Sequence, residues 1–159
     1  MCTAALELST NQVTHFYSKR KNTAEMIKML EMLLAKYRDQ DRIYLSWDAA
    51  SWHGSKAFFK RVDEINARDV NPALPRPQVE LAPLPSGAQC LNVIESVFSG
   101  MARAVIHNSD YASVNECKTA IDRYFRERNA AFAKNPRRAG NVIWGKEREL
   151  PIFSEANNC

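Results

Sequence analysis

The chain has 159 residues, a length that suits one domain with a buried core. Apolar residues make up 45% and charged residues 25%, an ordinary globular composition, and no stretch is apolar enough to predict a transmembrane helix. The net charge of +4 is a mild basic excess, which permits a polyanionic partner without requiring one.

The cysteine and histidine positions indicate neither a zinc site nor a disulfide framework. No two cysteines form a C-x-x-C pair, and the three histidines do not complete a zinc-binding pattern. The sequence shows no signal-peptide pattern, so we expect reduced thiols in the cytosol. Cys117, on the apolar face of a predicted helix, is expected to lie in the core.

The N-terminal part predicts a hairpin followed by an amphipathic helix. Thr3–Leu8 and Gln12–Tyr17 are short strand candidates, separated by a Ser-Thr-Asn turn. Asn22 opens the helix, with Glu25 three positions later as in a capping box. Apolar residues then recur at helical spacing as far as Tyr37.

The middle of the chain predicts a strand, a helix and a second strand. Arg42–Trp47 is rich in strand-forming residues and ends directly before Asp48. Ser55–Ala67 has a helical pattern, and the following stretch to position 77 carries three prolines, which indicates an irregular insertion. Val79–Leu81 is a short strand candidate.

The C-terminal part predicts two helices and a tail. One helix runs over Leu91–Val105, with an apolar stripe made by Leu91, Ile94, Phe98, Met101 and Val105. The other opens at Ser113 in an S-x-x-E capping box. We therefore expect an α/β domain over residues 1–134 and an extended tail over 135–159, anchored by Trp144.

Two carboxylates are placed where chemistry could occur. Asp48 follows a strand that reads as buried, and ligand sites gather at such strand ends in α/β sheets. Glu95 falls beside the apolar stripe of its helix, where a carboxylate is costly unless it is paired or metal-bound. Taken singly, each also fits a plainer role, a turn aspartate and a solvent-facing glutamate.

The surroundings of these two acids resemble the signatures of mariner-like DDE transposases of bacterial insertion sequences. The segment IYLSWDAASWHGSK is similar to the first signature, an apolar strand, an aspartate, a short spacer and a histidine. The segment LAPLPSGAQCLNVIESVFSGMAR is similar to the second, with Leu-Asn-x-Ile-Glu at the start of a helix. The helix SVNECKTAIDRYFRERN resembles the one that closes this domain.

The resemblance implies a ribonuclease-H-like mixed sheet with flanking helices and a two-metal phosphodiester chemistry. Asp48 and Glu95 match the second and third catalytic acids and would bind Mg²⁺ or Mn²⁺, while His53 and Asn92 match positions that flank the site. The implied partner is DNA, both transposon ends and target, and a homodimer is compatible with it. The basic residues expected to contact DNA are Lys19, Arg20, Lys21 and Arg103.

Three positions depart from the family pattern. Ala49 stands where an asparagine usually follows the second acid, and Leu84 and Val93 replace usual residues of the second signature. The interval between Asp48 and Glu95 is also long, because it contains the proline-rich insertion. These departures predict a divergent member of the family.

The first catalytic acid of the family has no counterpart in this sequence. It lies on the first strand, which precedes the hairpin and is central in the sheet, and no acid upstream of Asp48 stands in a matching motif. We therefore expect a fold that lacks this strand and a domain that is truncated and inactive alone. The sheet could close over the gap, remain open, or recruit a strand from another copy. The alternative to an endonuclease is a non-enzymatic remnant that binds DNA or a transposase.

Overall fold

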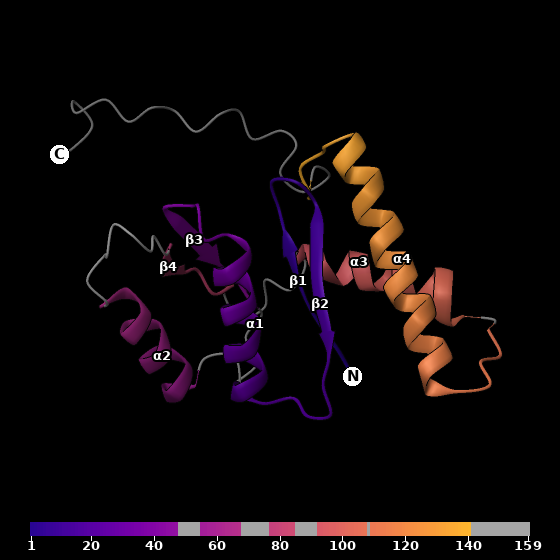
Figure 1. The fold of residues 1–159 in the computed structure, drawn as a ribbon, viewed down its shortest axis with the longest axis horizontal. Helices are drawn as coiled ribbons and strands as arrows, with labels where there is room; N and C mark the ends of the chain where they lie inside the picture. Colours follow the sequence, from indigo (N-terminus) through magenta and orange to yellow (C-terminus); the bar gives the residue numbers. More distant parts are fainter. Residues whose placement is uncertain (48–54, 68–76, 85–91, 108, 141–159) are drawn as a thin grey trace.

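The computed structural model describes residues 1–47, 55–67, 77–84, 92–107 and 109–140 (Figure 1). Strands and helices follow in the order β1, β2, α1, β3, α2, β4, α3, η2, α4, so the expected mixed α/β architecture is confirmed. No helix in this part of the chain has the length and apolar character needed to cross a membrane.

The predicted N-terminal hairpin is confirmed. Strands β1 (Cys2–Glu7) and β2 (Gln12–Tyr17) pair antiparallel, with Cys2 opposite Tyr17 and Glu7 opposite Gln12. In the turn, Asn11 has a φ of 60°, a left-handed conformation that asparagine tolerates better than most residues. Helix α4 lies against the hairpin (Figure 1).

A β-α-β unit follows the first helix. Helix α1 (Thr23–Lys36) begins at Asn22, whose side chain accepts a hydrogen bond from the Glu25 N–H at 3.1 Å, as predicted. Strand β3 (Arg42–Leu45) and strand β4 (Gln78–Leu81) then pair in parallel. Helix α2 (Lys56–Asn66), which starts at the predicted Ser55, lies between them in sequence and packs on β4.

The third predicted helix is shorter and turned differently from the prediction. It consists of α3 (Val93–Met101) and the π-helical segment η2 (Ala102–Ile106). Its buried side chains are Val93, Val97, Met101 and Val105, whereas Ile94 and Phe98 are only half-buried. The predicted stripe is therefore confirmed at Met101 and Val105, and it was wrong by one position earlier in α3, where Val93 and Val97 are buried in place of Ile94 and Phe98. Leu91 lies outside the described residues.

The last helix, α4 (Val114–Lys134), begins at the predicted cap. Ser113 accepts a hydrogen bond from the Glu116 N–H at 3.1 Å, and the Glu116 carboxylate accepts one from the Ala112 N–H at 2.8 Å. Ile121 and Phe125 are buried against the hairpin and α3, and Cys117 packs at the margin of the same core. The expectation that Cys117 lies in the core is confirmed in part, because this residue is half-buried.

The described side chains form two hydrophobic clusters that share no residue. The first joins α1, α2 and the β3–β4 pair; its buried members are Leu30, Leu34, Trp47, Phe58, Val62, Ile65 and Val79. The second joins the hairpin, α3, η2 and α4; its buried members are Val13, Val97, Met101, Val105, Ile121 and Phe125. Helix α1 lies between the two groups of strands (Figure 1) and also packs on β1.

The strands form two separate two-stranded sheets, β1–β2 and β3–β4. Among the described residues, no strand pairs with both β1 and β3, and the two do not pair with each other. The arrangement in which the sheet closes over the missing first strand is therefore not observed. One edge of β1 and one edge of β3 consequently lack a partner strand in the described part of the chain.

The opposite edges of the two sheets are each capped by an asparagine side chain. Asn129 of α4 accepts a hydrogen bond from the Val13 N–H and donates one to the Val13 C=O, both at 2.8 Å. Asn66 of α2 makes the same pair of bonds to Val79, both at 2.9 Å. An amide side chain thus imitates one residue of a neighbouring strand, which satisfies the buried backbone and blocks further pairing there.

Candidate catalytic site

Strand β3 leads directly to the first predicted catalytic acid. Its pairing with β4 continues beyond the strand, because the Leu84 N–H donates to the Trp47 C=O at 2.9 Å. Trp47 is buried and packs edge-on against Phe58, with ring centroids 5.6 Å apart. The chain is therefore firmly held up to the residue before Asp48. Asp48 itself and His53 lie outside the described residues.

The second predicted acid stands on the first turn of α3. Asn92 is the N-cap of this helix through its backbone C=O, which accepts from the Glu95 N–H at 3.1 Å, while its side chain makes no capping hydrogen bond. Glu95 is exposed, on the side of the helix away from Val93 and Val97. The expectation that Glu95 borders a buried face was therefore wrong, for the same reason that the apolar stripe was misplaced.

The Glu95 carboxylate is available for a ligand as far as the described residues are concerned. It makes no hydrogen bond or salt bridge with any of them, and a carboxylate near a helix N-terminus lies in a favourable field. Carboxylate oxygens are the ligands that Mg²⁺ and Mn²⁺ prefer, so the donor type fits these ions. Within the described ranges, no three His, Cys, Asp or Glu residues come together as a metal site.

Glu7, the one acid on a strand upstream of Asp48, already has partners. Its carboxylate accepts hydrogen bonds from the Tyr37 hydroxyl at 2.7 Å and the Ser9 hydroxyl at 2.8 Å. Burial alone would raise the pKa of Glu7, but these hydrogen bonds outweigh it and hold the pKa below its usual range. Glu7 therefore ties the hairpin to the end of α1 and is poorly placed to substitute for a missing catalytic acid.

The basic residues divide into exposed and structural ones. Lys19, Arg20 and Lys21 are exposed in the connection between β2 and α1, and Arg103 is exposed on η2, so all four can meet a polyanion. Arg128, on α4, instead donates hydrogen bonds to Asn11 and stacks on the Phe132 ring. Sequence reasoning gave no sign of this role, since its partner lies in the distant hairpin turn.

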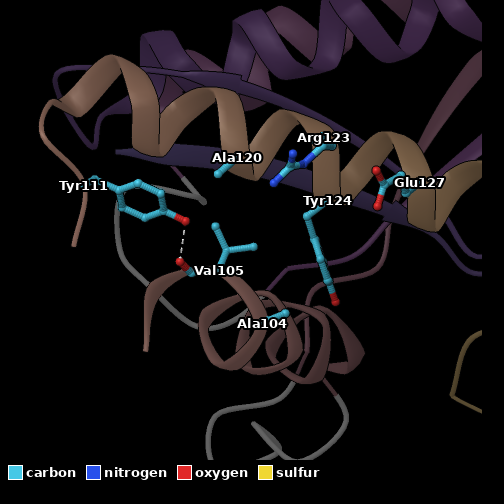
Figure 2. A pocket seen from close by; sticks show the side chains of 7 residues that line it. All are labelled: Ala104, Val105, Tyr111, Ala120, Arg123, Tyr124 and Glu127. Carbon is cyan, nitrogen blue, oxygen red and sulfur yellow. Dashed lines mark hydrogen bonds between the residues drawn. The ribbon is translucent and has the colours of Figure 1, made fainter. Parts of the chain in front are cut away.

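A surface hollow lies between η2 and α4 (Figure 2). Its volume is about 250 Å³, and its lining residues are Ala104, Val105, Tyr111, Ala120, Arg123, Tyr124 and Glu127. The Tyr111 hydroxyl donates to the Val105 C=O at 2.6 Å, which fixes one wall. Neither Glu95 nor the end of β3 contributes to this lining, so the hollow is separate from the predicted catalytic residues.

A family model for the DDE superfamily endonucleases matches residues 1–118. The match covers well over half of the chain and includes both Asp48 and Glu95. The chain therefore belongs to the DDE superfamily endonucleases, whose ribonuclease-H-like fold agrees with the small sheets and flanking helices observed, and whose members act on DNA with divalent metal ions. No curated protein matches the chain in sequence.

Proposed function

We propose that the chain is the catalytic-domain portion of a mariner-like transposase of a bacterial insertion sequence. Asp48 and Glu95 would be two of the metal ligands, and His53 and Asn92 would flank the site. The observation that carries the proposal is the family match through both signatures, supported by an exposed Glu95 that the described residues leave without a partner.

The chemistry proposed for the intact site is cleavage and transfer of a DNA strand. Bound Mg²⁺ or Mn²⁺ would supply activation of the attacking oxygen and stabilisation of the leaving one. This chain's own contribution is two hard oxygen ligands, one following the strand end at Trp47 and one on the first turn of α3. The substrates would be transposon ends and target DNA.

The domain is proposed to be inactive by itself. Two-metal chemistry needs ligands that bridge the ions, and no residue of this sequence matches the first acid of the family. Glu7 does not fill that role, because its carboxylate is already bonded to Tyr37 and Ser9.

Metal binding tests the proposed ligands. We expect Mn²⁺ to bind the protein weakly, measured by the enhancement of water proton relaxation, because two carboxylates remain. Asp48→Asn and Glu95→Gln should each weaken that binding by about tenfold or more, whereas Glu127→Gln, an acid on α4 outside the signatures, should not. If Glu95→Gln and Glu127→Gln bind Mn²⁺ like the unchanged protein, the ligand assignment is wrong.

A non-enzymatic DNA-binding remnant is the second candidate, favoured by the exposed cations Arg123 and Arg126 on α4. This role requires binding to duplex DNA in the presence of a chelator, with affinity that falls steeply as salt rises. Replacing both arginines by alanine should then reduce the affinity and the salt slope, measured by fluorescence anisotropy. Arg38→Ala with Lys60→Ala, which removes the same charge from exposed positions elsewhere, is the matched control. Binding that appears only with added metal would favour the endonuclease.

A further inference from the structure

Two lysines of α1 are held along β2 without losing their charge. The Lys28 ammonium lies 4.2 Å from the centroid of the Phe16 ring, and the Lys36 ammonium donates to the Thr14 hydroxyl at 3.0 Å. An aromatic ring or a hydroxyl fixes the position of an ammonium group, whereas a carboxylate would also neutralise it. Both lysines are exposed, so their positive charges stay accessible from solvent.

Three further cations follow the end of β2. Lys19, Arg20 and Lys21 are all exposed in the connection that leads from β2 to α1 (Figure 1). This connection is held near its start, because the Ser18 hydroxyl donates to the Arg20 C=O at 3.1 Å. It is held at its other end by Asn22, which is the N-cap of α1. The backbone that carries the three cations is therefore short and fixed at both ends, which lowers the entropy lost when they bind a ligand.

Arginines around α2 and β3 are, in contrast, paired with acids. Arg61 forms ion pairs with Glu31 and Glu64, and Arg42 lies 3.8 Å from the Glu80 carboxylate. Within the described ranges, no ion pair neutralises any of the five cations beside β2. Neighbouring cations without acidic partners repel one another, and a bound polyanion relieves that repulsion.

One acid lies on the same side of α1 as the two lysines. Glu25 stands in the first turn, and the rotation of the helix places it between Lys28 and Lys36 around the helix axis. It forms no ion pair with either lysine, or with any other cation in the part of the chain that the structure describes. Its negative charge would oppose a polyanion bound at this place.

We propose that the five cations form one binding site for the sugar–phosphate backbone of duplex DNA, the cation row: Lys19, Arg20, Lys21, Lys28 and Lys36. The identity of the polyanion rests on the proposed function, since the family acts on DNA. The backbone positions of Lys28 and Lys36 are roughly 12 Å apart, and one DNA strand carries a phosphate about every 3.4 Å of axis, so a duplex along the row presents several phosphates. Contacts to the backbone need neither a metal ion nor particular bases.

Fluorescence anisotropy of a labelled duplex, measured with the full chain in the presence of a chelator, tests the cation row. Lys28→Gln combined with Lys36→Gln should weaken binding and reduce the slope of log affinity against log salt by about one per lysine. Lys56→Gln combined with Lys60→Gln removes the same charge from exposed positions of α2 and should change both quantities much less. Equal losses in the two double variants would overturn the proposal, because net charge alone would then explain the binding.

Glu25→Gln keeps the test decisive if the lysine variants fold poorly, because a damaged fold cannot produce a gain in affinity. This variant should bind the duplex about twofold more tightly at low salt, the effect of removing one repelling charge at roughly 10 Å in water. Asp63→Asn, at an exposed position of α2, should leave the affinity unchanged. If Glu25→Gln and Asp63→Asn bind the duplex equally, the cation row is wrong.

The cation row and the proposed metal ligands can fail separately. Neither Asp48 nor Glu95 belongs to the row, so a failure of the Mn²⁺ measurement leaves the anisotropy result unaffected. Binding of the duplex that appears only with added metal would overturn the row and leave the metal ligands untouched. Binding in chelator that is lost with the arginines of α4, but not with the lysines of α1, would place the DNA on α4 and also overturn the proposal.

Discussion

Asp122 of α4 is the residue at which the hairpin and the last helix meet through polar contacts. Its carboxylate lies 2.8 Å from both the His15 ring nitrogen and the Tyr17 hydroxyl, and that hydroxyl also lies 2.9 Å from the Lys118 C=O. Burial raises the pKa of Asp122, but the hydrogen bonds from His15 and Tyr17 outweigh it and hold the pKa below its usual range. The folded state is thus linked to the ionised form of this carboxylate.

The linkage predicts an acid-sensitive contribution to stability. Because the folded pKa of Asp122 is depressed, its contribution is complete above the unfolded pKa of about 4 and is lost as pH falls through the folded value. Asp122→Asn should lower the free energy of unfolding at pH 6 and lower it less at pH 3, measured by urea denaturation. The side chain is 49% exposed, so solvent screening limits the difference to about 1 kcal/mol or less.

The control for this prediction is Asp110→Asn, an exposed carboxylate in the segment before α4. It should change stability equally little at both pH values. If Asp122→Asn loses as much stability at pH 3 as at pH 6, the contacts of His15 and Tyr17 with this side chain stabilise the fold independently of its negative charge.

At the scale of elements, local sequence signals predicted the starts of helices well and their faces less well. Asn22 and Ser113 begin their helices where the capping patterns placed them, because a cap depends on residues a few positions apart. The helix expected from Ser55 also begins there. The buried face of α3 was predicted at Met101 but misplaced by one position at its start, because that face depends on packing against α4 and β1. The asparagine caps of β2 and β4 join residues too distant in sequence for a local pattern to indicate.

These asparagine caps predict a specific stability loss. Asn129→Ala would leave the N–H and C=O of Val13 without their partner, and Val13 is only 4% exposed. We expect the free energy of unfolding to fall by roughly 1–3 kcal/mol, the usual cost of unsatisfied buried polar groups. Asn115→Ala, on an exposed turn of the same helix, is the matched control and should change stability by less than about 0.5 kcal/mol. Equal changes in both variants would mean that the asparagine cap of Val13 adds nothing to stability.

At the scale of the whole molecule, the α/β fold class was predicted from the order of strands and helices. The candidate catalytic residues were predicted from the two signature segments. Glu95 was found as a motif residue, and its exposure agrees with the plainer of its two interpretations, a solvent-facing glutamate. Whether Asp48 approaches Glu95 stays a prediction, because Asp48 and His53 lie outside the described residues. Spacing along the chain cannot supply that distance, since it depends on how α3 is placed against the end of β3.

The proposed inactivity of the domain can be tested on plasmid DNA. Incubation of supercoiled plasmid with this chain and Mg²⁺ or Mn²⁺ should give no nicking above the background of the protein-free reaction, because the matched acids are only Asp48 and Glu95. Glu95→Gln serves as the control and should be indistinguishable from the unchanged chain. Metal-dependent nicking that Glu95→Gln abolishes would show that another acid completes the site.

The separation of the two hydrophobic clusters has a consequence for cooperativity. Because the clusters share no side chain, the unfolding of one cluster does not by itself remove the packing of the other. Helix α1 is the common element, since Leu30 and Leu34 belong to the first cluster while Tyr37, at its end, bonds to Glu7 on the hairpin. All-or-none melting of the described fold thus rests on this one helix, and a weakened α1 would let each half of the molecule melt at its own temperature.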